Sequence, residues 1–254
     1  MANVKDFGAK GDGKTNDTEA LQHAVNEIDG VLELPRGDYR ILEPIVVPLQ
    51  RTGFAGIRGD QGTARILMEG RGPALRIVGD HQGTATPSTV KEHTWERERF
   101  PVISGFEVQG RHAEAEGIEL YRTMQTTIRE VLIRNCRYGI HLSERNRNFL
   151  LAQCHIYDNS DTGVFFDECN LHQVIIIGNH ISYCKRAGIR QFEGDVHNIQ
   201  ITGNDIEYNS GAKGTSGEIV LEASKGIISE FTISSNTLQA TAEASGANIL
   251  VDGQ

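Results

Sequence analysis

The sequence repeats a short pattern every 25 residues, and this repeat limits the folds that the chain can adopt. An asparagine follows a short apolar run at Asn179 and again at Asn204, and Cys154 occupies the equivalent position 25 residues before Asn179. A fixed period of this size is typical of solenoids, in which each unit buries its apolar face only against its neighbours. The sequence therefore predicts a stack of similar rungs.

Each repeat contains three short apolar or alternating runs separated by turns. In the repeat around Asn179 they cover residues 174–177, 180–183 and 188–191. Runs this short and rich in β-branched residues are strands rather than helices. Parallel strands without intervening helices wind into a β-helix, and its crossovers are right-handed. We therefore predict an all-β, right-handed parallel β-helix with three strands per rung and one inward column formed by Ile140, Val164, Ile189 and Ile219.

Asparagines recur at two turn positions. One position holds Asn179, Asn204 and Asn236, and the other holds Asn159 and Asn209 together with Cys184. Asparagine tolerates left-handed backbone and hydrogen-bonds its neighbours. These stacked asparagines are therefore predicted to be structural and not catalytic.

The N-terminal region reads as a helical cap. Asn16 and Glu19 have the spacing of a capping box just before apolar residues at helical intervals, which predicts a helix over about 17–29. The open end of a β-helix exposes core and strand edges, and a terminal unit has to cover them. We expect residues 1–48 to form this cap region within a single domain, 1–254, whose period is interrupted by an insertion at 79–101.

Composition excludes several classes of protein. The formal net charge is −9 and the chain has no run of five or more Lys or Arg, which argues against a nucleic-acid partner. No segment approaches the roughly 18 apolar residues of a membrane span. The N-terminus lacks the pattern of a signal peptide, so export to the periplasm or outside the cell is expected only if such a segment has been removed.

The four cysteines show no metal-ligand spacing and are expected to be small buried hydrophobes. Cys136 and Cys154 fall at the same turn position on adjacent rungs. A disulfide between them is geometrically possible.

The stretch VKDFGAKGDGKTNDTEAL at 4–21, followed by LPRGDYRI at 34–41, resembles the N-terminal signature of the pectate-lyase-like superfamily. This superfamily of right-handed parallel β-helix proteins includes polygalacturonases, rhamnogalacturonases, lyases and uronan epimerases. The resemblance implies a carbohydrate-active protein, but a shared fold does not specify a reaction. The N-T-D, Asp-Asp, G-H-G and R-I-K elements of polygalacturonases are absent at matching positions, so no catalytic residue is carried over from that branch.

Polar residues recur in register between the third strand of one rung and the first strand of the next. Their positions are counted back from the turn position that holds Cys154, Asn179 and Asn204. Eleven residues before it lie Glu168 and Glu193, and nine residues before it lie Arg145, Asn170 and Asp195. Seven residues before it lie Arg147, His172 and His197. Because adjacent strands lie about 4.8 Å apart, the two glutamates should be close, and one pKa should rise into the range of a general acid. Solvated turn residues would give the same pattern without any function.

We interpret these columns as a groove for a polysaccharide or oligosaccharide. The predicted catalytic residues are Glu168, Glu193, Asp195, His172 and His197, and the predicted substrate-binding residues are Arg145, Arg147, Asn170, Arg190 and Trp95. Trp95 lies in the 79–101 insertion, where it either stacks on a sugar or packs against the wall of the β-helix.

Two kinds of enzyme and one binding protein fit these residues. A glycoside hydrolase would use the carboxylates, whereas a polysaccharide lyase would use His172, His197 or Arg147 as the base. A lyase must also neutralise a uronate carboxylate, with arginine or with a Ca²⁺ held by acids such as Asp167 and Glu168. The alternative is a non-catalytic carbohydrate-binding or spike-like module. For the enzyme and for the module alike, the apolar strand at 249–251 favours homo-oligomers that form through the C-terminal edge.

Overall fold

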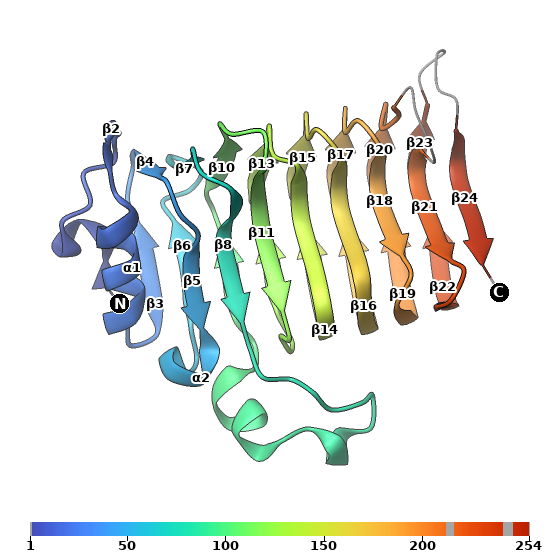
Figure 1. The fold of residues 1–254 in the computed structure, drawn as a ribbon, viewed down its shortest axis with the longest axis horizontal. Coiled ribbons are helices and arrows are strands. Elements are labelled where there is room, and N and C mark those ends of the chain that lie inside the picture. Colours follow the sequence, from blue (N-terminus) through green and yellow to red (C-terminus); the bar gives the residue numbers. More distant parts are fainter. Residues whose placement is uncertain (1, 212–215, 241–245, 254) are drawn as a thin grey trace.

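The computed structural model describes residues 2–211, 216–240 and 246–253, and its strands lie side by side along one long axis (Figure 1). Neighbouring strands pair in parallel from one turn of the chain to the next. The pairings define three columns of strands. Each column is formed by one of the three short runs of the sequence repeat.

The first column contains β5 (Ile45–Pro48), β8 (Gly72–Val78), β11 (Ala115–Tyr121), the first parts of β14 (Tyr138–Ala152) and β16 (Thr162–Ile177), β18 (Ala187–Phe192), β21 (Gly217–Ala223) and β24 (Ala247–Gly253). The second contains β1 (Ala2–Asn3), β3 (Val31–Leu34), β6 (Gly56–Gly59), β9 (Val102–Ser104), β12 (Thr127–Arg129), the later parts of β14 and β16, β19 (Asp195–Thr202) and β22 (Ile227–Ser234). The third contains β2 (Asp12–Asn16), β4 (Gly37–Ile41), β7 (Ala64–Met68), β10 (Glu107–Gly110), β13 (Leu132–Arg134), β15 (His155–Tyr157), β17 (His180–Ser182), β20 (Asp205–Glu207) and β23 (Thr237–Gln239).

The long strands β14 and β16 bend between the first and second columns. At this bend the register shifts after Ser143, and Glu144 has a left-handed φ of 62°. Glu168 and Glu193 occupy the same bend on the next two turns, with φ values of 45° and 51°. The bend therefore presents an acidic side chain at the same place on three successive turns.

The predicted inward column is confirmed. Ile140, Val164, Ile189 and Ile219 are aligned strand by strand, and all four are fully buried. Since side chains alternate between the two faces of a strand, His141 and Arg190, which follow Ile140 and Ile189, point outward.

The stacked asparagines are structural, as predicted. Asn204 Oδ1 accepts hydrogen bonds from the backbone N–H and the side-chain amide of Asn179, and Asn236 Oδ1 receives the same two bonds from Asn204. The left-handed backbone falls instead on the preceding Gly178 and Gly203, both with φ of 65°. Before Asn236 the same left-handed place is taken by Ser235, with φ of 56°. The ladder thus depends on a left-handed residue for the turn and on an asparagine for the hydrogen bonds.

The N-terminal helix α1 runs over Thr18–Glu27 and buries Leu21, Ala24 and Val25. It lies at the N-terminal end of the stack, close to the short 3₁₀ helix η1 (Val4–Phe7) (Figure 1). A second short helix, α2, covers Leu49–Thr52.

Residues 79–101 leave the stack between β8 and β9 and project to one side of it (Figure 1). This insertion contains the 3₁₀ helix η2 (Pro87–Thr89) and the π-helix η3 (Thr94–Glu98). It is held to the stack at two arginines described below.

The cysteines are buried and free, so the disulfide considered between Cys136 and Cys154 is not formed. Burial raises the pKa of the Cys136 thiol to about 12 and that of the Cys154 thiol to about 11. Both side chains therefore act as small hydrophobes. Among the described residues, no helix is both long and apolar enough to cross a membrane.

Candidate functional site

The outward face of the first column carries a cluster of polar and aromatic side chains around His141. Strand register places Glu119, His141, Phe165 and Arg190 next to one another on successive strands. Two residues further along, Ser143, Asp167 and Phe192 form a second outward row. We call Tyr138, His141, Phe165, Asp167 and Arg190 the His141 face.

His141 is held between two carboxylates. Its Nδ1 lies 3.1 Å from Oε2 of Glu116, and its Nε2 lies 3.1 Å from Oδ2 of Asp167. Burial alone lowers the pKa of this imidazole, but the hydrogen bonds to Asp167 and Glu116 outweigh burial and raise the pKa to about 9. At neutral pH His141 is therefore a fixed cation that donates from both nitrogens.

Tyr138 lies beside this cation. Its ring centroid is 5.2 Å from that of His141 and 4.8 Å from that of Phe165, and the Arg137 guanidinium lies 4.6 Å above its ring. Burial, with a smaller contribution from Asp161, raises the pKa of the phenol to about 12. Among the described residues, no group hydrogen-bonds its hydroxyl, so a neutral proton donor is available to a ligand.

Arg190, a predicted substrate-binding residue, belongs to this face. Its Nε donates to Oε2 of Glu222 at 2.7 Å. The guanidinium also packs over the rings of Phe165 and Phe192, at 5.1 and 4.8 Å. In the described part of the chain no hydrogen bond uses its two Nη groups, and the side chain is only 5% exposed.

The predicted columns of polar residues come together as expected from the repeat. Arg145, Asn170 and Asp195 are paired in register, and so are Arg147, His172 and His197. Four of the predicted residues, Glu168, Asn170, Glu193 and Asp195, line a groove of about 740 Å³ at the bend. We call it the bend groove; Phe192 lines it as well and connects it to the His141 face.

The expectation of a raised pKa in the glutamate pair is wrong for Glu193. Its carboxylate accepts hydrogen bonds from Ser224 Oγ at 2.5 Å and from the backbone N–H groups of Lys225 and Gly226 at 2.8 and 3.0 Å. These donors lower the pKa of Glu193, because they stabilise the ionised form. Glu193 is therefore a carboxylate at neutral pH and not a general acid.

The two predicted arginines, Arg145 and Arg147, hold the insertion. Arg145 Nη1 donates to the Gly83 carbonyl at 2.6 Å, and Arg147 Nη1 donates to the Thr84 carbonyl at 3.3 Å. Arg147 is buried. These arginines therefore dock residues 79–101 beside the groove, and a role in substrate binding has no direct support from their contacts.

The remaining predicted residues have mixed surroundings. Asp195 accepts from His197 Nε2 at 2.6 Å and from Asn170 Nδ2 at 2.9 Å. The Nδ1 of His172 is buried and has no hydrogen-bond partner. Trp95 lies in η3, which packs against α2, and no ring or cation–π contact in the described residues connects it to the groove.

Sequence reasoning recognised that His141 and Arg190 share an outward position but missed Tyr138, Glu116 and the pairing of Asp167 with His141. Alternation from the inward Ile140 would have indicated His141 and Ser143, but it would not have found Tyr138, which has the parity of Ile140 and reaches the outer face only through its ring contacts with His141 and Phe165. A Ca²⁺ held by Asp167 and Glu168 stays a prediction, and one Asp167 oxygen is already used by His141.

Comparison with known proteins places the chain in a family. Residues 102–238, more than half of the chain, match the model of the right-handed β-helix region. Residues 1–72 match the model described as rhamnogalacturonase A/epimerase, pectate lyase-like.

Individual relatives match smaller parts or share only the fold. Alginate lyase 7 of Azotobacter vinelandii is 56% identical over 43 residues, which are 15% of this chain and 5% of that protein. The A-module of the mannuronan C-5 epimerase AlgE4 from the same organism superposes with a TM-score of 0.65 and 16% identity, covering 100% of this chain and 77% of that one. The Agl-KA catalytic domain gives a TM-score of 0.56 and 14% identity, covering 98% of this chain and 57% of that one.

At these identities the superpositions describe the fold alone, and the curated relative is matched over a small fraction of its length. The family models extend over both the N-terminal region and most of the stacked strands. The chain therefore belongs to the right-handed parallel β-helix family of the pectate-lyase-like superfamily.

Proposed function

We propose that this protein is an enzyme that acts on a uronate polysaccharide bound across the His141 face and the bend groove, by removing the proton next to the uronate carboxylate. This first step is common to β-elimination by a polysaccharide lyase and to C-5 epimerisation. The observation that carries the proposal is the cationic His141, fixed between Glu116 and Asp167 beside the neutral phenol of Tyr138.

Glycoside hydrolysis has less support from the carboxyl groups. A hydrolase needs a carboxylic acid whose pKa is raised so that it can protonate the leaving oxygen. In the described residues the carboxyl groups with a raised pKa are Glu98 and Glu218. Both are at most 1% exposed, and neither lines the bend groove.

Proton abstraction beside a carboxylate requires a cation to stabilise the charge that develops there. His141 supplies a cation at neutral pH, although both of its N–H groups bond Glu116 and Asp167. The Nη groups of Arg190 supply a second cation, which a ligand would reach by displacing some of the surrounding side chains. The two carboxylates that flank His141 orient its ring and keep it protonated. A uronate carboxylate bound against these cations would acidify its α-hydrogen.

Tyr138 is the group that we assign as the proton donor. Its neutral hydroxyl is a proton donor for the glycosidic oxygen that leaves in an elimination, or for the ring carbon in an epimerisation. His172 and His197, predicted as bases, stay our candidates for the proton acceptor. Asp167 is assigned a positioning role through His141.

The names of two of the relatives support a uronate substrate. One is named an alginate lyase and another a mannuronan epimerase, and both names refer to polymers of uronic acids. The net charge of −9 would repel such a polymer on average, so a local cationic site is required. We assign His141 and Arg190 to this task, with their charge offset in part by Glu116, Asp167 and Glu222, which pair with them.

The proposal is tested by incubating the full chain with polymannuronate and with a neutral glucan. Elimination yields unsaturated ends that absorb in the ultraviolet, and epimerisation changes the proton NMR spectrum of the polymer without chain cleavage. Tyr138→Phe should lower either activity by about 10²–10⁴-fold, with little change in melting temperature, because the hydroxyl has no partner in the described structure.

Tyr183→Phe serves as the matched control, since Tyr183 is an exposed tyrosine on the turn after β17. It should retain full activity. New reducing ends without unsaturation would identify a hydrolase and overturn the proposal. Binding of polymannuronate without any product would favour the non-catalytic module.

A further inference from the structure

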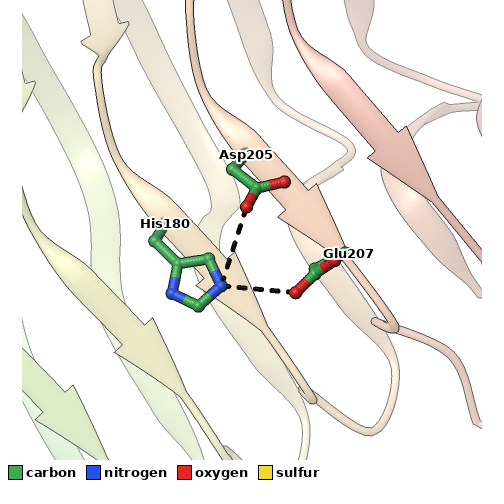
Figure 2. Close-up of side chains that lie close together, drawn as sticks. All are labelled: His180, Asp205 and Glu207. Carbon is green, nitrogen blue, oxygen red and sulfur yellow. Dashed lines mark ion pairs between the residues drawn. The ribbon is translucent and has the colours of Figure 1, made fainter.

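A second polar cluster lies on the outer face of the third column, away from the proposed substrate site. β17 and β20 are adjacent parallel strands, with His180 opposite Asp205 and Ser182 opposite Glu207. Asp205 and Glu207 are two residues apart and share the outer face, while Ile206 between them is fully buried. Figure 2 shows the three side chains of His180, Asp205 and Glu207 converging above these strands.

The three ligand atoms have the separations of a metal site. His180 Nε2 lies 3.5 Å from Oε1 of Glu207 and 3.9 Å from Oδ2 of Asp205. One ligand atom from each residue lies within 4.8 Å of both others. Ligands at about 2.0–2.2 Å from a tetrahedral zinc ion are separated by about 3.3–3.6 Å, so small side-chain rotations would complete the geometry.

The charges of the cluster also favour a cation. In the described residues, neither Asp205 nor Glu207 has a lysine or arginine nitrogen within 4.0 Å, and His180 is the partner of both. This distinguishes them from Asp38 and Glu107 on the same column, which are paired with Arg65 at 3.0 Å and Arg134 at 2.8 Å. The side chains are 23–49% exposed, so an ion can enter from solvent.

A second imidazole lies on the next strand. His155 in β15 is paired in register with His180, and the two ring centroids are 5.9 Å apart with their planes at 76°. Imidazole nitrogens together with carboxylate oxygens suit zinc and neighbouring transition metals, whereas calcium prefers oxygen ligands alone. The cluster therefore offers three ligands, an adjacent imidazole and room for water.

We propose that His180, Asp205 and Glu207 bind a divalent transition-metal ion of the zinc class. The ion would bridge β17 and β20, which belong to successive turns of the β-helix, and would tie these turns together. A ligand that binds only the folded state raises its stability in proportion to the logarithm of its concentration. The site is independent of the proposed enzymatic function.

The test is zinc titration of the metal-free full chain by calorimetry, together with Co²⁺ binding followed by visible absorption. We expect one bound ion that is lost in His180→Ala, an affinity at least tenfold weaker in Glu207→Gln, and a melting temperature of the unmutated protein that rises with Zn²⁺ concentration. Retention of the same stoichiometry and affinity in both variants would overturn the proposal.

His93 provides a matched control. Its Nε2 also lies 3.3 Å from each of two carboxylates, on Asp80 and Glu98, but Lys91 Nζ already occupies the Asp80 carboxylate at 2.7 Å. His93→Ala should therefore keep the bound ion. Loss of zinc in His93→Ala but not in His180→Ala would place the metal in the insertion and contradict the site on β17 and β20.

Discussion

The asparagine ladder and the His141 face are both rows of polar side chains at fixed register, but they differ in what satisfies the polar groups. In the ladder, Asn179, Asn204 and Asn236 repeat the same residue, and the buried Asn179 and Asn204 each hydrogen-bond the next asparagine. On the His141 face the residue type changes at every strand, and His141 bonds two different acids. A repeated polar residue therefore stabilises the stack, whereas a row of unlike residues brings acidic, basic and aromatic side chains together at one turn of the β-helix.

The largest effect on stability is expected from breaking the ladder. Asn204→Ala removes the acceptor for the Asn179 backbone N–H and side-chain amide, and it removes the donor to the Ile176 carbonyl. Each buried group left unpaired costs about 1–3 kcal/mol, so the free energy of unfolding should fall by about 3 kcal/mol or more. Urea denaturation measures this change.

The control for this prediction is Gln200→Ala, because Gln200 is exposed on β19. Substitution there should change the free energy of unfolding by less than about 0.5 kcal/mol. A loss of under 1 kcal/mol in Asn204→Ala would mean that the ladder contributes no more than an ordinary surface residue.

The pH dependence of stability should separate the His141 face from the ladder, whose amides do not titrate. The pKa of His141 is raised from 6.5 to about 9 in the folded protein. Its stabilising contribution, about 3 kcal/mol from this shift, is complete below about pH 6.5 and is lost as pH rises through about 9. Melting temperatures measured from pH 6 to 10 should show this loss, and His141→Asn should flatten it.

Glu218, at the end of the second asparagine row, titrates in a lower window. Burial raises the pKa of its carboxyl from 4.5 to about 7, so its contribution is present below pH 4.5 and is lost as pH rises through 7. Glu218→Gln should therefore leave the loss between pH 6.5 and 9 intact. If that variant removed the alkaline loss, the assignment to His141 would be incorrect.

The smallest effect is expected for Glu193→Gln. Glu193 is held ionised by three donors in the bend groove, and an ionised group at neutral pH cannot be the general acid. We expect turnover to change by less than tenfold and the melting temperature to stay close to that of the unmutated protein. Steady-state kinetics on polymannuronate would decide, and a 10²-fold loss would return Glu193 to the catalytic machinery.

The sequence also predicts that copies of the chain associate through the C-terminal edge. Val251 in β24 is 61% exposed, and the neighbouring Ile249 is 41% exposed. Association of copies through this edge stays a prediction, since exposed apolar strands favour pairing.

The amino-acid sequence by itself determined the architecture, because every turn of a β-helix repeats the same short-range pattern of apolar and polar residues. The 25-residue period, the inward position of Ile140 and its equivalents, and the hydrogen-bonded asparagines all follow from alternation along short strands. Register then aligned Asn170 with Asp195 and His172 with His197, as the repeat predicts. Each of these relations involves the same position on neighbouring turns.

The tertiary structure decided which polar side chains act together. His141 meets Glu116 and Asp167 from residues 25 and 26 positions away on either side, and Glu193 receives its donors from a turn 31–33 positions later. Arg145 and Arg147 bond a loop more than 60 residues earlier in the chain. Such contacts depend on side-chain rotamers, on the sharpness of the bend and on the path of an insertion, and these are fixed only when the turns pack against one another.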